Sequence, residues 1–355
     1  MIMTLFWQLG LISVLRSAAQ DISEEQARTC WDDPSFHPAF CCHPRFGSDG
    51  FHECWEGMYT AKLCCNETLW SPSLVLSFHQ SLQASWANRC GRKDINEKGI
   101  PWHWKDGIGW ELMYFFMYLR AGVHSPNQVP AAEIAGFLNP EMPLKQRLVE
   151  LLVRDVLGRN IESPRSARIL DIGAGPMSQV GYIWPGVDVE VVVADALACE
   201  YDQIRLDIGL AIPPQAVPRV ATAETLVGIF GGGAFDIVHC SNSLDHAYDP
   251  LLGVEQMLGV VKLGRPVLLQ HKINEGQKNE YGGMHQWNFE VQDGRFIIWR
   301  PADEKRGIVA ERMDVASHLV AKGLIAVDGI EFRDMNNPYG KPGWVEIVLW
   351  RSTTL

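Results

Sequence analysis

The chain has 355 residues, of which 47% are apolar and 21% are charged, and its formal net charge at neutral pH is −11. Packed globular proteins have this composition, and the length allows one large domain together with a smaller module. Phosphate binding is carried by basic side chains, and no cluster of Lys and Arg is present, so the sequence argues against a nucleic-acid partner.

The N-terminal segment is almost wholly apolar over residues 1–15 and is followed by Ser17-Ala18-Ala19. Small residues at positions 17 and 19 suit signal peptidase, and the run is too short for a stable membrane span. Residues 1–19 are therefore predicted to be a cleaved signal peptide. A plain apolar N-terminus is the alternative, because no Lys or Arg precedes the run. We expect the secretory pathway or the extracellular space, with a cytoplasmic location as the alternative.

A cysteine-rich module is predicted over residues 20–92, which hold seven of the nine cysteines. Its imperfect repeat reads Cys-Trp-acid, a spacer, then Cys-Cys, and it occurs at 30–42 and again at 54–65. So small a segment builds little core and needs covalent staples. No Cys-x-x-Cys is present, so disulfides are favoured over zinc, in a connectivity that the sequence does not choose. Cys90 is either free or part of the module.

Three further positions bear on the compartment. Asn66-Glu67-Thr68 is a glycosylation sequon, which is meaningful for a chain that enters a secretory lumen. Cys199 and Cys240 lie far from the module, and both are predicted to be buried thiols.

A helical connector is predicted over residues 93–144. Within it, Trp110–Arg120 is apolar nearly all round, which predicts a buried helix too short to cross a membrane. Residues 143–157 place apolar and charged side chains at helical spacing, which predicts another helix.

Two apolar strands, each ending in an acid, are predicted around a glycine turn. The first ends at Asp171 and breaks into Gly173-Ala174-Gly175, and the second, Val189–Ala194, ends on Asp195. In an open α/β sheet this arrangement describes a nucleoside-binding crevice. The glycines lack Cβ and let the backbone approach a ligand, while Asp195 is placed to accept hydrogen bonds from ribose hydroxyls.

The glycine turn departs from the dinucleotide pattern. A third glycine would pack helix against strand in a nicotinamide-binding fold, but Ser178 occupies that position. The acid at Asp171 suits a ligand with a positive ammonium group instead. A nicotinamide-dependent reductase therefore remains an alternative that the sequence disfavours.

Strands and helices alternate along the rest of the chain. The strand over 218–223 leads to Glu224, and the strand over 235–242 closes on Asn242. The remaining predicted elements are a helix over 251–261, which Pro250 opens, a strand over 266–270, and two edge strands over 324–332 and 344–350.

These motifs, in this order, resemble class I S-adenosylmethionine-dependent methyltransferases. The resemblance covers roughly residues 145–350 and implies a methyltransferase domain over 145–355. This domain would have a Rossmann-like α/β fold with a seven-stranded, mostly parallel sheet flanked by helices. It implies S-adenosylmethionine as the cofactor and N-terminal helices within 95–145 as a lid over the substrate. The implied cofactor-binding residues are Asp171, Gly173, Gly175, Asp195, Glu224 and Asn242.

The chain resembles one subgroup of these enzymes more closely. Leu244-Asp245-His246 is followed by Asp249-Pro250 after the fourth strand, and His285-Gln286-Trp287-Asn288-Phe289 follows the fifth. The resemblance supports cofactor and reaction type better than it supports a substrate.

Three histidines are candidate bases for a hydroxyl acceptor, because the imidazole pKa lies near the working pH. They are His246, His271 and His285, all expected at the carboxyl edge of the sheet. Each also has a structural interpretation, as a helix cap or as a half-buried side chain. Trp287 and Asn288 are candidate substrate-binding residues. No metal site is predicted, because no His-x-x-x-His pair or acidic cluster has ligand spacing.

The function expected from these features is O-methylation of a small molecule or a sugar. The alternative is a catalytically inactive, methyltransferase-like secreted protein that serves in binding or interaction. The acceptor, the methylated atom and the oligomeric state do not follow from the sequence.

Overall fold

A computed structural model describes residues 41–42, 64–65, 72–91, 102–124, 129–335 and 343–353. The chain divides into two compact units, of which the smaller comprises 1–88 and 113–132 and the larger comprises 89–112 and 133–355. The predicted signal peptide, most of the cysteine-rich module and the Asn66 sequon lie outside the described residues. The predicted boundaries at 20–92, 93–144 and 145–355 remain predictions.

The smaller unit contains the helix α5 (Pro72–Arg89) and the second half of α6 (Trp102–His124). These helices contact each other where the Trp86 and Phe116 rings lie 5.7 Å apart. A disulfide joins Cys42 to Cys65, one cysteine from each Cys-Cys pair of the repeat. Cys41 and Cys64 are disulfide-bonded as well, so the preference for disulfides over zinc is confirmed at these four positions. The predicted helix over 110–120 is confirmed as part of the longer α6.

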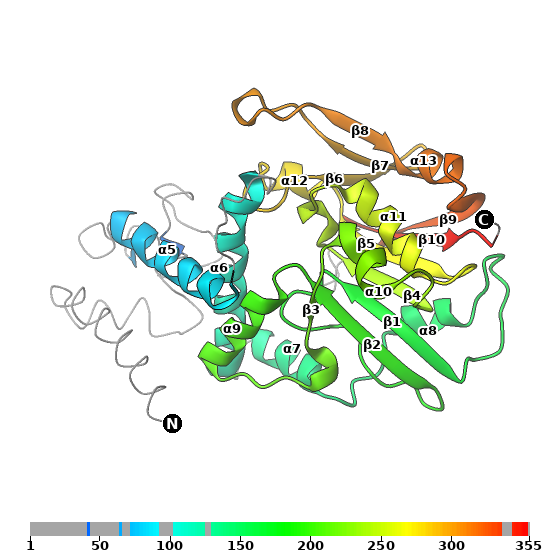
Figure 1. Cartoon of the computed structure of the whole chain (residues 1–355), viewed down its shortest axis with the longest axis horizontal. Helices are drawn as coiled ribbons and strands as arrows, with labels where there is room; N and C mark the ends of the chain where they lie inside the picture. Colours follow the sequence, from blue (N-terminus) through cyan, green and yellow to red (C-terminus); the bar gives the residue numbers. More distant parts are fainter. Residues whose placement is uncertain are drawn as a thin grey trace. The chain divides into compact units, whose positions relative to one another are not determined.

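The larger unit is built on a seven-stranded sheet in the order β3-β2-β1-β4-β5-β10-β9 (Figure 1). The first five pair in parallel, and β10 runs antiparallel to both neighbours. The predicted Rossmann-like, mostly parallel sheet is thereby confirmed. The strands are β1 (Ser166–Ile172), β2 (Asp188–Asp195), β3 (Arg219–Val220), β4 (Ile237–Ser241), β5 (Pro266–Lys272), β9 (Ile325–Met335) and β10 (Trp344–Arg351).

Both faces of the sheet are buried, which is why its parallel strands are continuous apolar runs. One face packs against α10 (Leu226–Phe230), α11 (Pro250–Val260) and α13 (Val315–Ala321). The other face packs against α8 (Gln146–Leu152). The described helices are completed by α7 (Val129–Leu138), α9 (Ala198–Ile208) and α12 (Glu275–Lys278). No helix in the described ranges is both long enough and apolar enough to cross a membrane.

The helix α11 begins as its sequence predicts. The Asp249 carboxylate accepts a hydrogen bond of 2.9 Å from the Leu252 amide, and Pro250 occupies the first helical turn. Proline is tolerated there because its missing N–H would have no partner within the helix.

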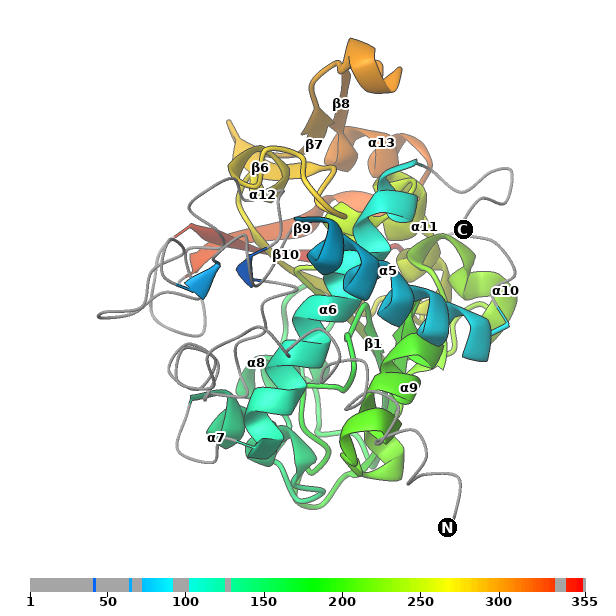
Figure 2. The same cartoon turned by 90° about the vertical axis from the view of Figure 1, so that its left-hand side faces the viewer.

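Two strand predictions need correction. The strand β10 was expected at the sheet edge, but it lies between β5 and β9, because six of its eight residues are buried and need a neighbour on each side. A second, three-stranded sheet was not expected at all. It consists of β6 (Asn288–Gln292), β7 (Arg295–Arg300) and β8 (Glu311–Asp314), and it packs on α13 (Figure 2).

The two cysteines outside the module have different fates. Cys240 is buried and forms no disulfide, as predicted. Cys199 was also expected to be a thiol, but it is bonded to Cys90 with the two Cα atoms 5.8 Å apart. The prediction failed because the two cysteines are 109 residues apart in sequence and meet through the tertiary fold.

Candidate active site

The strand order reverses between β1 and β4, and ligands of open α/β sheets bind at such a switch point, beyond the carboxyl ends of the strands. The turn after β1 contains Gly173 and Gly175 at φ of 67° and 66°. A Cβ on Gly173 would lie 1.9 Å from the Ser243 hydroxyl oxygen. This glycine is therefore required by the close approach of the loop that follows β4, in addition to its left-handed backbone.

Asp195 ends β2 and turns its carboxylate toward the glycine turn. One oxygen accepts a hydrogen bond of 2.9 Å from the Gly175 amide, and the other accepts one of 2.7 Å from the Leu197 amide. The side chain is buried, and burial raises the pKa of Asp195 to about 6 although the two amides oppose the shift. These amides hold the carboxylate in one orientation, and each oxygen keeps a second lone pair.

Asp171 is buried under the same turn and is held by side chains. The Ser178 hydroxyl donates to one oxygen at 2.7 Å, and His239 Nδ1 lies 2.6 Å from the other. Burial by itself would raise the pKa of Asp171, but His239 and Ser178 outweigh it and hold that pKa below its usual value. The sequence predicts that Asp171 binds an ammonium group of the ligand. In the structure, each oxygen of this carboxylate already has a protein partner.

Glu224 and Asn242 brace the loops around the switch point. Glu224 Oε1 accepts hydrogen bonds from the Tyr248 and Asp249 amides at 2.7 and 3.1 Å. Asn242 adopts a φ of 49°, and its side-chain oxygen accepts a hydrogen bond of 3.0 Å from the Lys272 amide. Their predicted contacts with a cofactor stay predictions beside these structural roles.

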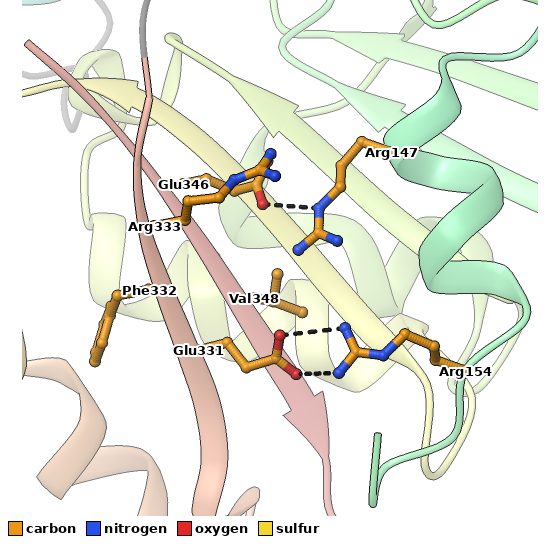
Figure 3. Close-up of a pocket in the computed structure, with 7 residues that line it drawn as sticks. All are labelled: Arg147, Arg154, Glu331, Phe332, Arg333, Glu346 and Val348. Carbon is orange, nitrogen blue, oxygen red and sulfur yellow. Dashed lines mark hydrogen bonds and ion pairs between the residues drawn. The ribbon is translucent and has the colours of Figure 1, made fainter. Parts of the chain in front are cut away.

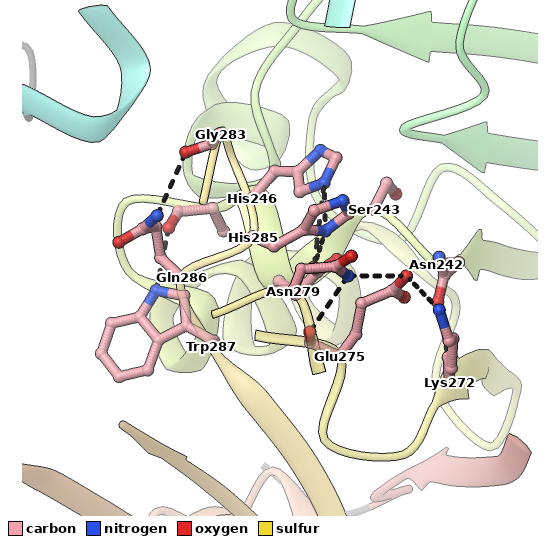
Figure 4. A network of polar contacts seen from close by, with 12 residues as sticks. Asn242, Ser243, His246, Lys272, Glu275, Asn279, Gly283, His285, Gln286 and Trp287 are labelled. Carbon is pink, nitrogen blue, oxygen red and sulfur yellow. Dashed lines mark hydrogen bonds and ion pairs between the residues drawn. The ribbon is translucent and has the colours of Figure 1, made fainter. Parts of the chain in front are cut away.

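Two of the three candidate histidines come together with Asp245. Asp245 and His246 belong to the short 3₁₀ turn η5 (Leu244–His246), and His285 lies on the segment between α12 and β6. His285 Nδ1 lies 2.7 Å from Asp245 Oδ2 and 3.1 Å from His246 Nε2, with the two rings adjacent in Figure 4. Burial would lower the pKa of His285, but Asp245 outweighs burial and raises it to about 9. Burial raises the pKa of Asp245, and the contact with His285 opposes that shift.

The segment around His285 is fastened by its consecutive side chains and amides. The Gln286 amide donates to the Asp245 carbonyl, and the Trp287 indole N–H donates to the Ala247 carbonyl at 3.0 Å. The Asn288 side-chain oxygen accepts from the Gln277 amide at 2.7 Å. The aromatic and amide residues of this motif therefore serve to present His285.

Three sequence-predicted site residues do not reach the cluster. His271 lies on β5 and is buried, stacks on Phe289 with 4.5 Å between the ring centroids, and has a pKa that burial lowers to about 3. It is a neutral core residue and not a base at working pH. Trp287 and Asn288 are 2% and 0% exposed, so both belong to packing rather than to a surface that a substrate contacts.

A carboxylate that sequence reasoning missed lies close by. Glu111, on α6, is partly buried, and burial raises its pKa to about 7; His285 opposes this shift, while Asp195 and Asp245 add to it. The Glu111 side chain also forms a hydrogen bond with Tyr201 on α9. The available signal was the lone acid in the apolar stretch 110–120, since an acid on such a face is rarely buried without a functional or structural partner.

Negative charge therefore accumulates at this edge of the sheet. Glu111, Asp195, Asp245 and Glu275 interact electrostatically with one another or with His285. Lys272 lies 3.0 Å from Glu275 Oε1, and it points to that carboxylate in Figure 4. The site as a whole suits a cationic ligand, because buried like charges are relieved by a cation.

A separate cavity of about 250 Å³ lies on the opposite side of β10 from α11, lined by charged side chains of α8, β9 and β10 (Figure 3). Arg147 pairs with Glu346 at 2.8 Å, and Arg154 pairs with Glu331 at 2.9 Å. These charges satisfy one another, so the cavity offers little to an ionic ligand.

Neither a family model nor a curated protein sequence matches this chain. Among solved structures, the CurJ carbon methyltransferase is similar at 13% identity and a TM-score of 0.38, over 87% of this chain and 77% of that one. An S-adenosylmethionine-dependent methyltransferase from Clostridium acetobutylicum is similar at 10% identity and a TM-score of 0.33, over 64% of this chain and 97% of that one. A possible histamine N-methyltransferase from Thermotoga maritima is similar at 14% identity and a TM-score of 0.31, over 62% of this chain and 96% of that one. Similarities of this strength carry no argument about the reaction.

Proposed function

We propose that this protein transfers a methyl group from S-adenosylmethionine to a hydroxyl of a small molecule or a sugar. The observation that carries the proposal is the Asp195 carboxylate, held at the end of β2 by the Gly175 and Leu197 amides. A carboxylate at this place in a doubly wound sheet is suited to accept hydrogen bonds from both hydroxyls of a ribose.

The residues at the switch point fit the cofactor. Asp195 and the glycine turn would hold its nucleoside and amino-acid parts, and Glu224 and Asn242 would border them. Excess negative charge from Glu111 and Asp195 suits a ligand with a sulfonium and an ammonium group. When bound, the cofactor would supply a methyl group already activated on sulfur, so the protein mainly has to align the acceptor.

The acceptor's hydroxyl would bind at the cluster of Asp245, His246 and His285. Both histidines remain candidate catalytic residues, since they are adjacent, half-buried and fixed by Asp245. His271 is less suited to this role, because it is buried and stacks on Phe289. Water would be kept from the site by the fastened segment after α12, which covers the loop that follows β4.

The test is calorimetric titration of the full chain with S-adenosylmethionine, S-adenosylhomocysteine and NAD. Micromolar binding of the first two ligands is expected, without binding of NAD. The variant Asp195→Ala should lose at least about tenfold in affinity, because the ribose contacts disappear. Asp188→Ala, an exposed acid at the start of the same strand, is the matched control and should bind normally.

The same titration separates the alternatives. Binding of NAD alone would favour the reductase. A folded protein that binds none of the three would leave the interpretation as an inactive secreted interaction protein.

A further inference from the structure

We infer that Asp245, His246 and His285 form a binding site for a divalent transition-metal ion. Each residue offers one ligand atom, and the three atoms, His246 Nε2, His285 Nδ1 and Asp245 Oδ2, lie close together. Their separations are 2.7, 3.1 and 3.8 Å. Adjacent ligands of a tetrahedral ion with bonds of about 2.0 Å lie about 3.3 Å apart, so the three atoms need to shift little to coordinate one.

A second observation is that two carboxylate oxygens near these ligands are buried without a partner among the described residues. Asp245 Oδ1 and Glu275 Oε2 are buried and have no hydrogen-bond partner within the described part of the chain. Asp245 is 1% exposed and Glu275 is 6% exposed, and the two carboxylates interact unfavourably. Buried carboxylate oxygens normally accept hydrogen bonds or bind a metal. A bound cation would therefore offset the charge of these two carboxylates.

Surrounding backbone contacts hold the candidate ligands in place, and metal sites depend on such contacts for their affinity. Asp245 and His246 are neighbours in one 3₁₀ turn, so one backbone conformation sets both side chains. The segment with His285 is fastened to this turn through the Asp245 and Ala247 carbonyls. The three ligands thus come from two segments that are already joined without the ion.

The ligand set indicates the class of metal. Two imidazoles and one carboxylate suit Zn²⁺ and similar transition metals, while Mg²⁺ and Ca²⁺ prefer all-oxygen sites. Three protein ligands leave a fourth position open, as in catalytic zinc sites. Provided that the proposed function holds, this position would take a hydroxyl oxygen of the acceptor. The acceptor would then be a molecule able to ligate a metal through oxygen.

The test measures metal binding without any reaction. The full chain is freed of metal with a chelator and titrated with Zn²⁺ by calorimetry, and then with Co²⁺, whose visible absorption reports tetrahedral coordination. One Zn²⁺ site is expected that is absent from His246→Ala, whatever other residues of the chain bind zinc. In Asp245→Asn the Zn²⁺ affinity of this site should fall at least about 100-fold. The matched control is His318→Ala, because His318 pairs with Glu255 and no third ligand lies beside it among the residues that the structure describes. Thermal unfolding shows whether each variant is folded.

Equal Zn²⁺ binding by wild type and a folded His246→Ala would overturn the inference, as would the absence of the tetrahedral Co²⁺ spectrum. The cluster would then be a hydrogen-bonded group in which His285 Nδ1 contacts both Asp245 Oδ2 and His246 Nε2. Titration of the metal-free protein with S-adenosylhomocysteine separates this failure from that of the proposed function, because cofactor binding depends on Asp195. Metal binding without cofactor binding leaves the metal site standing and removes the methyltransferase proposal.

Discussion

His285 Nδ1 lies 2.7 Å from the Asp245 carboxylate although 40 residues separate them in sequence. This contact joins the loop after β4 to the segment after α12, on opposite sides of β5 in the chain order. It places two imidazoles and a carboxylate within reach of one ligand.

Trp287→Phe should lower the free energy of unfolding by about 1–2 kcal/mol, because the Ala247 carbonyl loses its donor while the ring is largely replaced. The measurement is urea unfolding followed by circular dichroism. The matched control is Trp299→Phe, since the Trp299 indole N–H is buried without a partner among the described residues and its removal should cost nothing. Equal losses in the two variants would contradict the fastening role of Trp287.

Gly173→Ala should destabilise the protein by several kcal/mol, roughly 2–4, because the added Cβ meets Ser243 and the backbone is left-handed. Gly186→Ala is the control: its φ is 80° but no atom lies within 4 Å of the added Cβ, so only about 1 kcal/mol of backbone strain is expected.

A second substitution separates the steric part of this effect. Ser243→Gly in the Gly173→Ala background removes both side-chain atoms that the new Cβ would meet. Stability should recover to about the level of the Gly186→Ala control. If the double variant is no more stable than Gly173→Ala alone, the close approach of the two loops is not the cause.

His271 should make the protein acid-labile. Its pKa is about 3 in the folded protein, against 6.5 as the ordinary value. The unfolded chain therefore binds a proton that the folded protein does not, so stability is present above the unfolded pKa and is lost as the pH falls below about 6.5. The loss should be about 1.4 kcal/mol per pH unit from this residue.

His271→Phe removes the titrating group and keeps an aromatic ring against Phe289. Unfolding free energies of wild type and variant, measured between about pH 4 and pH 7, should diverge toward acid in favour of the variant. Parallel curves would show that His271 is not held neutral. The variant should also retain cofactor binding, which a cofactor-binding role for His271 would not allow.

Cofactor affinity should depend on the ionisation of Asp195. Burial raises the pKa of Asp195 to about 6, so the carboxylate that accepts ribose hydroxyls is formed only above that pH. Affinity for S-adenosylhomocysteine should rise between about pH 5 and pH 7 and then level off. Calorimetry at several pH values checks this, and Asp195→Asn should bind weakly without the rise. A wild-type profile that stays flat over this range would exclude Asp195 as the titrating contact.

Much of the sheet could be predicted because its determinants are local. The apolar run of β1 reaches Asp171 one residue before the strand ends, and β2 ends on Asp195. Asp249-Pro250 opens α11 through contacts within one helical turn. Periodicity and capping act over a few residues, so they can be read without knowing the rest of the fold.

The tertiary structure decided which residues share the site. Sequence could not separate His246 and His285 from His271, because all three were expected at the carboxyl edge of the sheet. Packing separates them, since His271 lies within β5 and is buried against Phe289. Glu111 joined the site from α6, and Cys90 met Cys199, through contacts between residues that are distant in the chain. Such contacts depend on how whole elements pack, and no local pattern of residue types encodes that packing.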